Sequence, residues 1–431
     1  MRFRCITFGC RVNQYETQAI REQLQAKGHV AVPEGEEVDL LIVNSCTVTE
    51  AADRECIRSV RVLHKVHPEG KIVVTGCLVQ RDADLLKALP GVRLLVGTHQ
   101  KHRIADWIEE DRETRAWQLE PRIETELSRV YSPLSVGHFA ERSKAFLKVQ
   151  DGCDRSCAFC KIPLVRGRAR SRNLSDALEE VRRLVGRGLK EIVLTGVAIG
   201  LWGREWHPPR SLADLIDAID DLPGPFRVRL SSLDPRDLDD RLIDSLLTSR
   251  RMCRHLHLSL QSGSDSILNR MNRGYTCDGF RRRVEAIRGH WPDLGLTTDL
   301  VVGFPGETQE QFQETLDFCR QMQFAKMHIF PYSRRRGTSA WFFKGECARS
   351  LVKERARIAR ATAAGIAREF RERFVGGVEE VLVEERGAGE GLLLGSTGQF
   401  LKVRFSGPPT HIGKLVPVQI VGVRQEGLLG L

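Results

Sequence analysis

The chain has 431 residues, of which 41% are hydrophobic and 28% are charged, and its formal net charge is +10. This length predicts two or three domains with sizeable cores, and the positive charge favours an acidic partner over a neutral one, unless it only reflects an arginine-rich proteome. No apolar run is long enough to cross a bilayer, and the opening MRFRCITFGC lacks the apolar core of a secretory signal. We therefore expect a cytoplasmic protein without a membrane partner, whose 12 cysteines stay reduced unless they bind metal.

The first third of the sequence alternates short apolar runs with helical stretches. Strands are predicted at 2–8, 38–43, 71–75 and 94–96, and helices at about 14–27, 51–66 and 83–89. This alternation is typical of a parallel sheet covered by helices, that is, of an α/β domain. The polar stretch 109–141 predicts the exit from this domain, so we place the domain at 1–125 and a linker at 126–141.

A second α/β series is predicted after the linker. Its strands fall at 145–149, 191–195, 227–230, 255–260, 297–302 and 328–331, with helices at 175–187 and 309–322. Six strand–helix repeats predict a partial TIM-type barrel over 142–374, which ends in a long helix at 350–374. The tail after Gly376 and Gly377 predicts short strands with Gly and Pro turns, hence a small β-barrel at 375–431.

Three cysteines with C-x3-C-x2-C spacing follow the first strand of this second series. Cys153, Cys157 and Cys160 can bind three irons of a four-iron cube and leave the fourth iron open to a small chelating molecule. A structural zinc site needs four ligands, usually as two C-x2-C pairs, and no second pair occurs in the chain. A disulfide is disfavoured in a reducing compartment. The spacing therefore favours an iron–sulfur cluster.

Three further cysteines each follow a predicted strand of the first domain. Cys10, Cys46 and Cys77 end the runs TFGC, VNSC and VTGC. Because parallel strand ends meet at one edge of a sheet, the three thiols are expected to converge and to form a second three-cysteine site. Gly9 and Gly76 would allow close backbone approach there. Ordinary buried cysteines, or zinc, remain alternatives for this set.

These motifs, in this order, resemble the methylthiotransferases, a radical S-adenosylmethionine (SAM) family with three domains. The resemblance covers nearly the whole chain and rests on TFGCRVNQYET, VNSCTVT, VTGCLVQ, QDGCDRSCAFCKIPLVRGRARSR, LTGVAIG, RLSSLDP, HLHLSLQSGSDSILNRMNRGYT, TTDLVVGFPGET and FPYSRRRGTSA. It implies two [4Fe-4S] clusters, with the SAM cluster on the C-x3-C-x2-C cysteines and an auxiliary cluster on the strand-end cysteines. The C-terminal barrel is similar to the RNA-binding TRAM domain.

The resemblance also implies a reaction and its partners. One SAM methylates a sulfur at the auxiliary cluster, and a second SAM is cleaved to a 5′-deoxyadenosyl radical that removes hydrogen from the substrate carbon. An electron donor of the flavodoxin or ferredoxin type and the anticodon stem-loop of tRNA are the expected partners, and the enzyme is expected to be a monomer. VNQYET and HIFPYSRRRGTSA are most similar to the subgroup that modifies C2 of N6-threonylcarbamoyladenosine at position 37.

Other functions stay open at this point. Sister subgroups modify isopentenyladenosine in tRNA or an aspartate of a ribosomal protein, and both resemble this chain in general plan. An iron–sulfur RNA-binding sensor without catalysis is a further alternative from a different class. A SAM cleavage assay separates a sensor from an enzyme.

Several residues are candidates for SAM binding because they lie in loops that follow predicted barrel strands. Phe159 supplies an aromatic ring before the third cysteine of the loop, and Ala198 stands where the family pattern has a polar Asn. Helix capping, backbone capping or a salt bridge are the alternative roles for the polar candidates and for Glu307. The full set of expected SAM contacts is Phe159, Ser231, Ser232, Gln261, Asp299 and Gly303.

Two basic runs lie next to the predicted active site. KIPLVRGRARSR follows the cysteine loop and contains no acidic residue, and RRR follows the last predicted barrel strand. Arginine suits phosphate because its planar fork contacts two oxygens, whereas a solvated basic surface is the alternative. We expect RNA contacts from Lys161, Arg166, Arg168, Arg170, Arg172, Arg334, Arg335 and Arg336.

Overall fold

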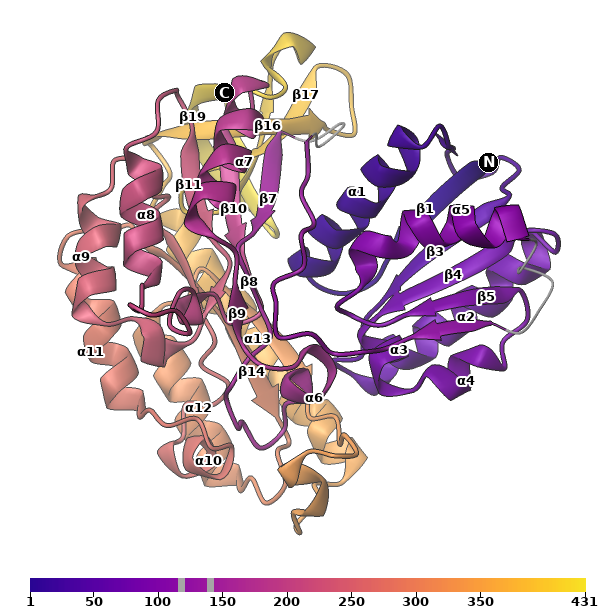
Figure 1. Ribbon diagram of the computed structural model, residues 1–431. Helices are drawn as coiled ribbons and strands as arrows, with labels where there is room; N and C mark the ends of the chain where they lie inside the picture. Colours follow the sequence, from indigo (N-terminus) through magenta and orange to yellow (C-terminus); the bar gives the residue numbers. More distant parts are fainter. Residues whose placement is uncertain (115–120, 138–142) are drawn as a thin grey trace.

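The computed structural model describes residues 1–114, 121–137 and 143–431 (Figure 1). Its strands form three groups along the chain: a six-stranded sheet, an open series of strands divided into sheets of three and four, and a closed barrel. The three groups lie within the predicted boundaries 1–125, 142–374 and 375–431. The last residues of the predicted linker, 138–141, lie outside the described residues.

The N-terminal sheet is entirely parallel, with the strand order β2-β1-β3-β4-β5-β6. The strands are β1 (Arg2–Thr7), β2 (Val30–Ala31), β3 (Leu40–Ser45), β4 (Lys71–Gly76), β5 (Val92–Val96) and β6 (Arg122–Glu124). The helices are α1 (Arg11–Ala26), α2 (Glu50–Val66), α3 (Cys77–Arg81), α4 (Ala83–Lys87) and α5 (Ile104–Thr114).

Both faces of this sheet are covered, as the apolar run of β3 predicts. Leu40 and Ile42 pack with α1 and α5, whereas Leu41 and Val43 pack with α2, α3 and α4. Alternate residues of one strand point to opposite faces, so all four are buried in two separate cores. The predicted strands and helices of this domain are confirmed, with ends shifted by a few residues.

The stretch 109–141 is not the simple exit that its polarity predicts. Residues Glu109–Thr114 belong to α5, and β6 pairs in parallel with β5 at the end of the sheet. An edge strand keeps one side in solvent, so charged residues such as Arg122 and Glu124 are compatible with strand structure there. Because the stretch is polar, the sequence did not predict the strand β6.

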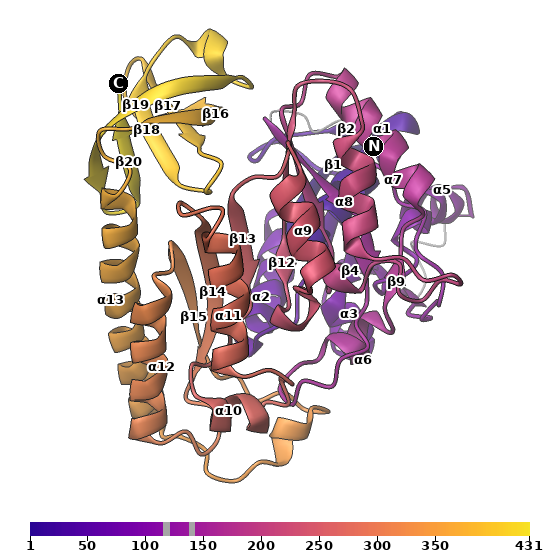
Figure 2. The same ribbon diagram turned by 90° about the vertical axis from the view of Figure 1, so that its left-hand side faces the viewer.

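The second group of strands curves into an open barrel that all six predicted strands enter (Figure 2). Its main strands are β7 (Lys144–Lys148), β10 (Glu191–Thr195), β11 (Arg227–Leu230), β13 (His255–Leu258), β14 (Gly295–Val302) and β15 (Lys326–Pro331). Short strands are β8 (Gln150–Asp151), β9 (Arg170–Ser171) and β12 (Ser232–Leu233). A parallel bridge between Val228 and Met252 joins the sheet of three to the sheet of four.

Helices cover the outer face of this open barrel, which positions loop chemistry at the strands' carboxyl ends. They are α7 (Leu174–Gly186), α8 (Leu212–Asp220), α9 (Asp240–Thr248), α10 (Asp265–Arg270), α11 (Cys277–Arg288), α12 (Gln309–Met322) and α13 (Arg349–Glu372). The short helix α6 (Ile162–Arg166) packs instead against α3 of the N-terminal domain. The large core between strands and helices includes Leu194, Leu230, Leu256 and Phe280. The partial TIM-type prediction is confirmed.

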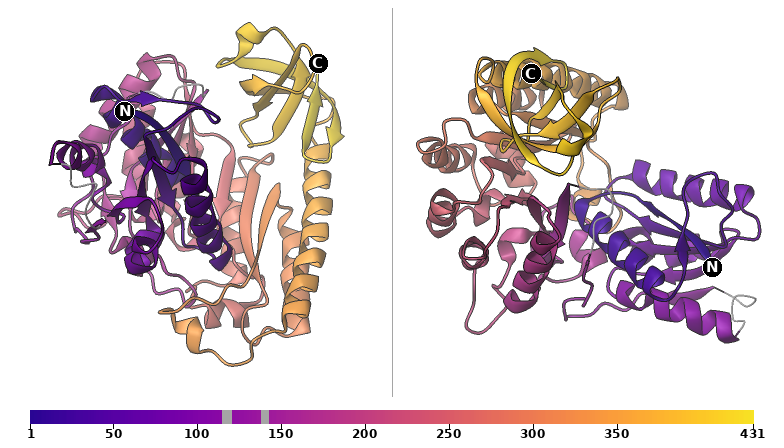
Figure 3. Two further views of the ribbon diagram at one scale, coloured as in Figure 1. Left: turned by 90° about the vertical axis from the view of Figure 1, so that its right-hand side faces the viewer. Right: turned by 90° about the horizontal axis from the view of Figure 1, so that it is seen from above.

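The C-terminal barrel stands at the end of α13 (Figure 3). Its strand order is β16-β17-β18-β20-β19, and β19 pairs back with β16 to close it. The strands are β16 (Val378–Arg386), β17 (Leu392–Ser396), β18 (Lys402–Ser406), β19 (Leu415–Arg424) and β20 (Gly427–Gly430). Apolar residues that include Val381, Val403 and Ile420 fill its interior, and the predicted small β-barrel is confirmed.

Phe400 is the point where the three parts of the chain meet. It lies in the turn between β17 and β18, with φ at +68°. Arg229 of the open barrel lies 4.8 Å from its ring centre, and Arg11 of the N-terminal domain lies 5.5 Å from it. Arg229 also donates hydrogen bonds to the carbonyl oxygens of Thr397 (3.0 Å) and Gly398 (2.9 Å). These contacts seat the small barrel on the base of the open one.

Candidate functional site

The loop that carries Cys153, Cys157 and Cys160 lies between β8 and α6, after the first strand of the open barrel. Backbone hydrogen bonds fix its course, from the Cys153 amide to the Gly167 carbonyl (3.0 Å) and from the Cys160 amide to the Cys157 carbonyl (3.0 Å). All three thiols are free and line one cavity of about 160 Å³. The loop therefore brings its three thiols together without help from any other cysteine.

The same cavity contains part of the predicted SAM-binding set. Phe159, Ser232 and Gln261 line it, and so does Ala198, which supplies no polar side chain at that point. Gln261 has a positive φ of 70°. Gln261 lies three residues beyond the end of β13, so this backbone turn is at the carboxyl end of the strands, where barrel chemistry occurs.

Three other predicted SAM contacts do not line this cavity. Ser231 is buried, and its hydroxyl has no hydrogen-bond partner among the described residues. The carboxylate of Asp299 lies 3.2 Å from Nε2 of His257. Gly303 donates its amide to Glu307 (2.8 Å), and a Cβ there would overlap Val352 of α13. The backbone at Gly303 packs against α13, so the structure does not support the prediction that Gly303 contacts SAM.

Glu307 has a structural role that its position in the predicted loop did not reveal. Its carboxylate accepts the Gly303 amide and forms an ion pair with Arg355 of α13 at 2.8 Å. Burial raises the pKa of Glu307, and these two contacts act in the opposite direction. The salt-bridge alternative is therefore the one that the structure displays.

Arginines that sequence reasoning did not single out surround the cysteine loop. The guanidinium of Arg273 lies 3.1 Å from Sγ of Cys157 and 2.9 Å from the carboxylate of Asp234. Arg236 also pairs with Asp234, at 2.9 Å, and Arg155 does so at 3.0 Å. Arg236 directly follows the motif RLSSLDP and Arg273 lies in RMNRG, so their place next to these family-like motifs was the available signal.

Burial makes two of the loop thiols weaker acids. It raises the pKa of Cys160 to about 12 and raises that of Cys153 as well. Positive charge favours the thiolate, and a coordinated metal ion deprotonates a thiol outright. The arginines beside Cys157 would partly neutralise the charge of a thiolate-bound cluster.

The second cysteine set is assembled by the N-terminal sheet. Cys10 precedes α1, Cys46 follows β3 and Cys77 begins α3 directly after β4. Strands β1, β3 and β4 are neighbours, so the three cysteines meet at one sheet edge. The negative charge of Cys77, and to a smaller extent of Cys10, adds to burial in raising the pKa of Cys46 to about 12.

Two glycines allow this convergence. Gly9 has φ +94°, and a Cβ on it would lie 2.8 Å from Sγ of Cys46. Gly76 has φ +104°, and a Cβ on it would lie 2.4 Å from the carbonyl oxygen of Ser45. Since L side chains rarely adopt such φ values and neither position has space, only glycine fits without displacement. The expected close backbone approach at both positions is present.

A buried ion cluster joins the two cysteine sets. Its members are Glu16, Lys101, Lys148, Asp151 and Arg166. Arg166 Nη1 lies 3.0 Å from both Glu16 and Asp151, and its Nε lies 3.4 Å from Sγ of Cys77. Lys148 pairs with Glu16 (2.6 Å) and Asp151 (2.7 Å), and Lys101 pairs with Glu16 (2.5 Å).

This cluster spans the junction between the domains. Glu16 belongs to the helix after Cys10, Asp151 precedes Cys153, and Arg166 ends the helix after Cys160. Burial alone would raise the pKa of Glu16, but Arg166, Lys101 and Lys148 together hold it well below its usual range. The carboxylate is thus charged, and removal of one partner would leave an uncompensated charge in a dry interior.

Four of the predicted RNA contacts are buried in ion pairs. Arg166 belongs to the buried ion cluster, and Arg170 pairs with Asp151 at 3.0 Å. Arg172 pairs with Glu180 at 2.8 Å, and Arg335 pairs with Asp53 at 2.6 Å. Carboxylates from distant segments meet these side chains, so the prediction that they form a phosphate-binding surface is wrong for this arrangement.

The other four predicted RNA contacts reach solvent. Arg168 and Arg336 are exposed, and Lys161 is half-buried. Arg334 is exposed and pairs with Glu346 at 3.2 Å. The basic surface beside the site is therefore smaller than the two runs predict, and it comprises these four residues.

Comparisons with known proteins agree with this architecture. Residues 2–97 match the model of the uncharacterized protein family UPF0004, and residues 147–319 match that of the radical SAM superfamily. The chain is 37% identical to the threonylcarbamoyladenosine tRNA methylthiotransferase MtaB of Thermotoga maritima, over 98% of this chain and 95% of the relative. It is 35% identical to MtaB of Bacillus subtilis, over 96% and 92%.

A relative of a second kind is similar over the whole length. The tRNA-2-methylthio-N(6)-dimethylallyladenosine synthase of Pelotomaculum thermopropionicum is 34% identical, over 100% of this chain and 97% of that protein. Among solved structures, the radical S-adenosylmethionine methyltransferase TsrM of Kitasatospora setae aligns with a TM-score of 0.59 and 14% identity, over 85% of this chain and 89% of that one. This last likeness supports the fold.

The radical SAM match implies SAM and a [4Fe-4S] cluster, and the residues of the cysteine loop fit both. Three free thiols face one cavity, which is the donor set of a cluster with one open iron. The same cavity extends past Phe159, Ser232 and Gln261, so a molecule bound at the open iron would contact them. Among the described residues, no helix is both long and apolar enough to span a membrane.

Proposed function

We propose a reaction for this chain, which belongs to the radical SAM methylthiotransferase family: methylthiolation of C2 of N6-threonylcarbamoyladenosine at position 37 of tRNA. The observation that carries the proposal is the pair of three-cysteine sets joined by the buried ion cluster. The names of the Thermotoga maritima and Bacillus subtilis relatives support the choice of substrate.

The proposal includes a second [4Fe-4S] cluster on Cys10, Cys46 and Cys77. These thiols are free, lie at one sheet edge and leave room for close backbone approach at Gly9 and Gly76. Arg166 would offset part of the negative charge of the Cys77 thiolate. Three ligands again leave one iron open, as sulfur transfer from this site requires.

When bound, SAM and the two clusters supply one-electron cleavage of SAM, a hydrogen-abstracting radical and a sulfur to be transferred. The protein's own residues supply positions. The buried ion cluster fixes α1, the cysteine loop and α6 relative to one another. Fixed spacing matters because a reactive radical must meet its target before it meets anything else. Phe159 and Gln261 shape the wall of the cavity on the SAM side.

The RNA partner is proposed to be the anticodon stem-loop. Lys161, Arg168, Arg334 and Arg336 provide cations near the site, and the closed C-terminal barrel provides a further surface. A net charge of +10 favours association with a polyanion. The enzyme would act as a cytoplasmic monomer with an electron donor of the flavodoxin or ferredoxin type.

A second candidate substrate is dimethylallyladenosine. The Pelotomaculum thermopropionicum relative supports it over the full chain, and a synthase of the same name from Frankia alni is 39% identical over 81% of this chain and 70% of that protein. The two candidates differ only in the N6 substituent, so one experiment separates them.

The test is expression of wild type and Cys157→Ala in a bacterial strain that lacks its own tRNA methylthiotransferases. Nucleosides from digested tRNA are then weighed by mass spectrometry. We expect methylthio-threonylcarbamoyladenosine from wild type and none from the variant. Methylthio-dimethylallyladenosine instead would select the second candidate, and no methylthiolated nucleoside from soluble, cluster-loaded protein would refute both.

A further inference from the structure

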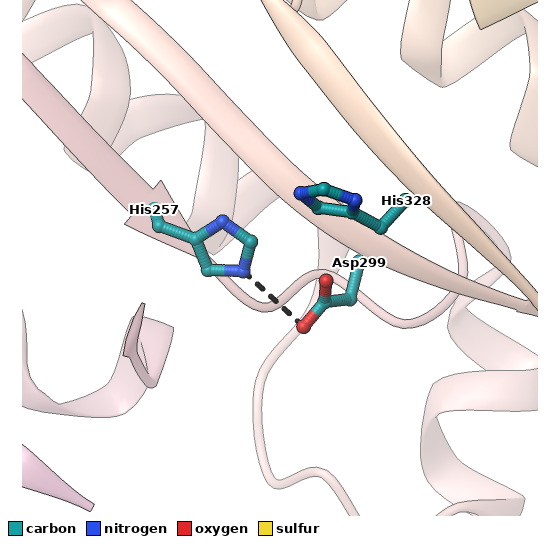
Figure 4. Close-up of side chains that lie close together, drawn as sticks. All are labelled: His257, Asp299 and His328. Atoms are coloured by element: carbon teal, nitrogen blue, oxygen red, sulfur yellow. Dashed lines mark ion pairs between the residues drawn. The ribbon is translucent and has the colours of Figure 1, made fainter. Parts of the chain in front are cut away.

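Three ionisable side chains gather on the inner face of the open barrel (Figure 4). His257 of β13, Asp299 of β14 and His328 of β15 place one ligand atom each within 4.8 Å of the others. The dashed line in Figure 4 marks the 3.2 Å contact between His257 Nε2 and Asp299. Asp299 was an expected SAM contact but does not line the cavity of the cysteine loop, and the two histidines have no role assigned so far.

Strand alternation shows which way these side chains point. Leu256, Leu258, Leu300 and Met327 pack into the core under the helices. Their neighbours His257, Asp299 and His328 therefore face the opposite side, which is the hollow of the barrel. The group lies on the same inner face that carries the reacting site.

The group lies next to the cavity of the cysteine loop. Ser259, two residues after His257 on the same strand face, lines that cavity. Gln261, also in the lining, donates its amide to the carbonyl oxygen of Asp299 at 2.8 Å. A substrate base that reached the cavity would thus bring its substituents close to these side chains.

Arg11 approaches the group from the opposite side. It directly follows Cys10 and is half-buried above Phe400. Partial burial of the His328 ring lowers its pKa, and the positive charges of Lys326 and Arg11 act in the same direction. Among the described residues Arg11 has no carboxylate in ion-pair distance; the negative charge of Glu191 acts on it, but that carboxylate is already paired with Arg227 and Arg229. Burying such a charge is costly unless a partner arrives.

The two histidines differ in how many of their ring nitrogens have a hydrogen-bond partner. Nδ1 of His257 lies 3.0 Å from the Thr297 hydroxyl, and its Nε2 lies 3.2 Å from the Asp299 carboxylate without making a hydrogen bond among the described residues. His328 is exposed, its ring lies 6.0 Å from that of His257, and it has no hydrogen-bond partner among the described residues. Arg11 and His328 are therefore the free donors, while Asp299 remains an acceptor at the same place.

A metal ion is the competing occupant for two histidines and a carboxylate. Nδ1 of His257 is already at hydrogen-bond distance from Thr297, and the positive charges of Lys326 and Arg11, which both act on His328, oppose a further cation at this place. An anion with hydrogen-bond donors of its own suits the group better. Arg11 and His328 would donate to the anion, and Asp299 would accept from its donors.

We infer that Arg11 and His328, with the His257–Asp299 pair beside them, bind the N6 substituent of the substrate adenosine and select one that carries a carboxylate. This inference rests on the proposed function, because the threonylcarbamoyl group has a carboxylate, a hydroxyl and N–H groups. A dimethylallyl group has none of these. It would leave desolvated polar groups unpaired, and sites built to hydrogen-bond a substrate reject such analogues strongly.

The experiment uses two synthetic anticodon stem-loops that differ only in the N6 substituent, threonylcarbamoyl or dimethylallyl. Full-length, cluster-loaded wild type is assayed first on both. Wild type that methylthiolates only the dimethylallyl stem-loop would refute the proposed function, whatever the variants do. Wild type that prefers the threonylcarbamoyl stem-loop allows the inference itself to be tested.

The variants are Arg11→Gln and His328→Leu, with Arg11→Lys as the conservative change. We expect kcat/KM for the threonylcarbamoyl stem-loop to fall about ten- to a hundredfold, as for loss of a charged hydrogen bond, and Arg11→Lys to recover part of it. The ratio of kcat/KM between the two stem-loops should fall with it. RNA binding measured by fluorescence anisotropy, without reductant, should show the same loss of discrimination in Kd.

Arg282→Gln is the matched control, because Arg282 is an exposed arginine on α11 that pairs with Asp278 of the same helix. It should keep the wild-type ratio. Equal losses on both stem-loops would overturn the inference and point to an RNA phosphate as the anion. An unchanged ratio would also overturn it, as would loss of a zinc or iron ion, beyond the cluster irons, in His328→Leu.

Discussion

The two cysteine sets are built in different ways. Cys153, Cys157 and Cys160 lie on one short loop, are half-buried and share a cavity. Cys10, Cys46 and Cys77 come from three strand ends, and two of them are buried. The first set needs only its own loop to be assembled, whereas the second exists only once β1, β3 and β4 have paired.

This difference teaches where each site is vulnerable. The loop set depends on local backbone hydrogen bonds and on nearby arginines such as Arg273. The strand-end set depends on sheet register, on glycines that permit close approach and on the buried ion cluster. Changes to the loop should therefore affect chemistry without unfolding, whereas changes around the strand ends should affect both.

The largest expected effect separates the two sets directly. Cys157→Ala and Cys46→Ala should each lower the iron content from about eight to about four per chain, because one [4Fe-4S] cluster loses a cysteine ligand. Both should abolish methylthiolation, but only Cys157→Ala should abolish 5′-deoxyadenosine formation. Iron analysis and product chromatography are the measurements. Cys347→Ala, at a half-buried cysteine outside both sets, is the control. Loss of SAM cleavage in Cys46→Ala would show that the sets are not independent.

The next effect concerns the junction between the sets. Arg166→Met should destabilise the protein by about 3–5 kcal/mol, because Glu16 and Asp151 lose a buried cationic partner. Urea unfolding followed by circular dichroism measures the change. Arg168→Met removes an exposed arginine from the same run and should stay within about 0.5 kcal/mol of wild type. Similar, small changes in both variants would contradict the role of the buried ion cluster.

A smaller effect tests the close approach at the strand-end set. Gly76→Ala should cost about 1–3 kcal/mol, because φ is +104° and the added Cβ would meet the Ser45 carbonyl oxygen. It should also reduce iron bound next to Cys77. Gly365→Ala, in the exposed interior of α13 with open space around it, should instead stabilise by about 0.5–1 kcal/mol. Thermal unfolding of both variants gives the comparison, and a neutral Gly76→Ala would disprove the steric argument.

The smallest effect is a pH dependence beside the buried ion cluster. Burial, with help from Arg170, lowers the pKa of His99 to about 4, and Nδ1 of its ring accepts the Ser128 amide. A histidine in the unfolded chain has a pKa of about 6.5. Between pH 4 and pH 6.5, roughly, the unfolded state therefore binds more protons than the folded state. The stability that depends on neutral His99 is complete above about pH 6.5 and is lost as the pH falls toward about 4.

Urea midpoints at pH 7, 5.5 and 4.5 for wild type and His99→Gln check this prediction. Glutamine does not titrate, so the variant should lose less stability on acidification than wild type. Parallel decreases in the two proteins would show that His99 does not contribute to the pH dependence.

Much of the fold could be predicted from apolar pattern and spacing. Strands 191–195 and 227–230 and helix 309–322 have the predicted ends, because each combines a regular period with clear turn signals. The strand Arg122–Glu124 was missed because a charged edge strand has no apolar pattern. The cysteine loop was visible as local spacing, and the strand-end set became visible through topology.

The site predictions failed where distant partners decide the outcome. A basic run does not show that Glu16, Glu180 and Asp53 approach it from other segments. Arg166, for example, lies in an arginine-rich stretch but is fully enclosed. Ser231 and Gly303 follow strands as predicted, yet neither lines the cavity. Arg273 and the group around His328 appear only when strands have paired.

The buried ion cluster has a consequence for the substrate. Sliding the N-terminal domain away from the open barrel would separate Arg166 from Glu16 in a dry interior, which costs several kcal/mol. The loop set and the strand-end set of cysteines are therefore expected to stay at a fixed separation during turnover. The conformational change is then expected in the nucleic acid. The target nucleotide must unstack and turn toward the cavity of the cysteine loop, at a cost of roughly a few kcal/mol.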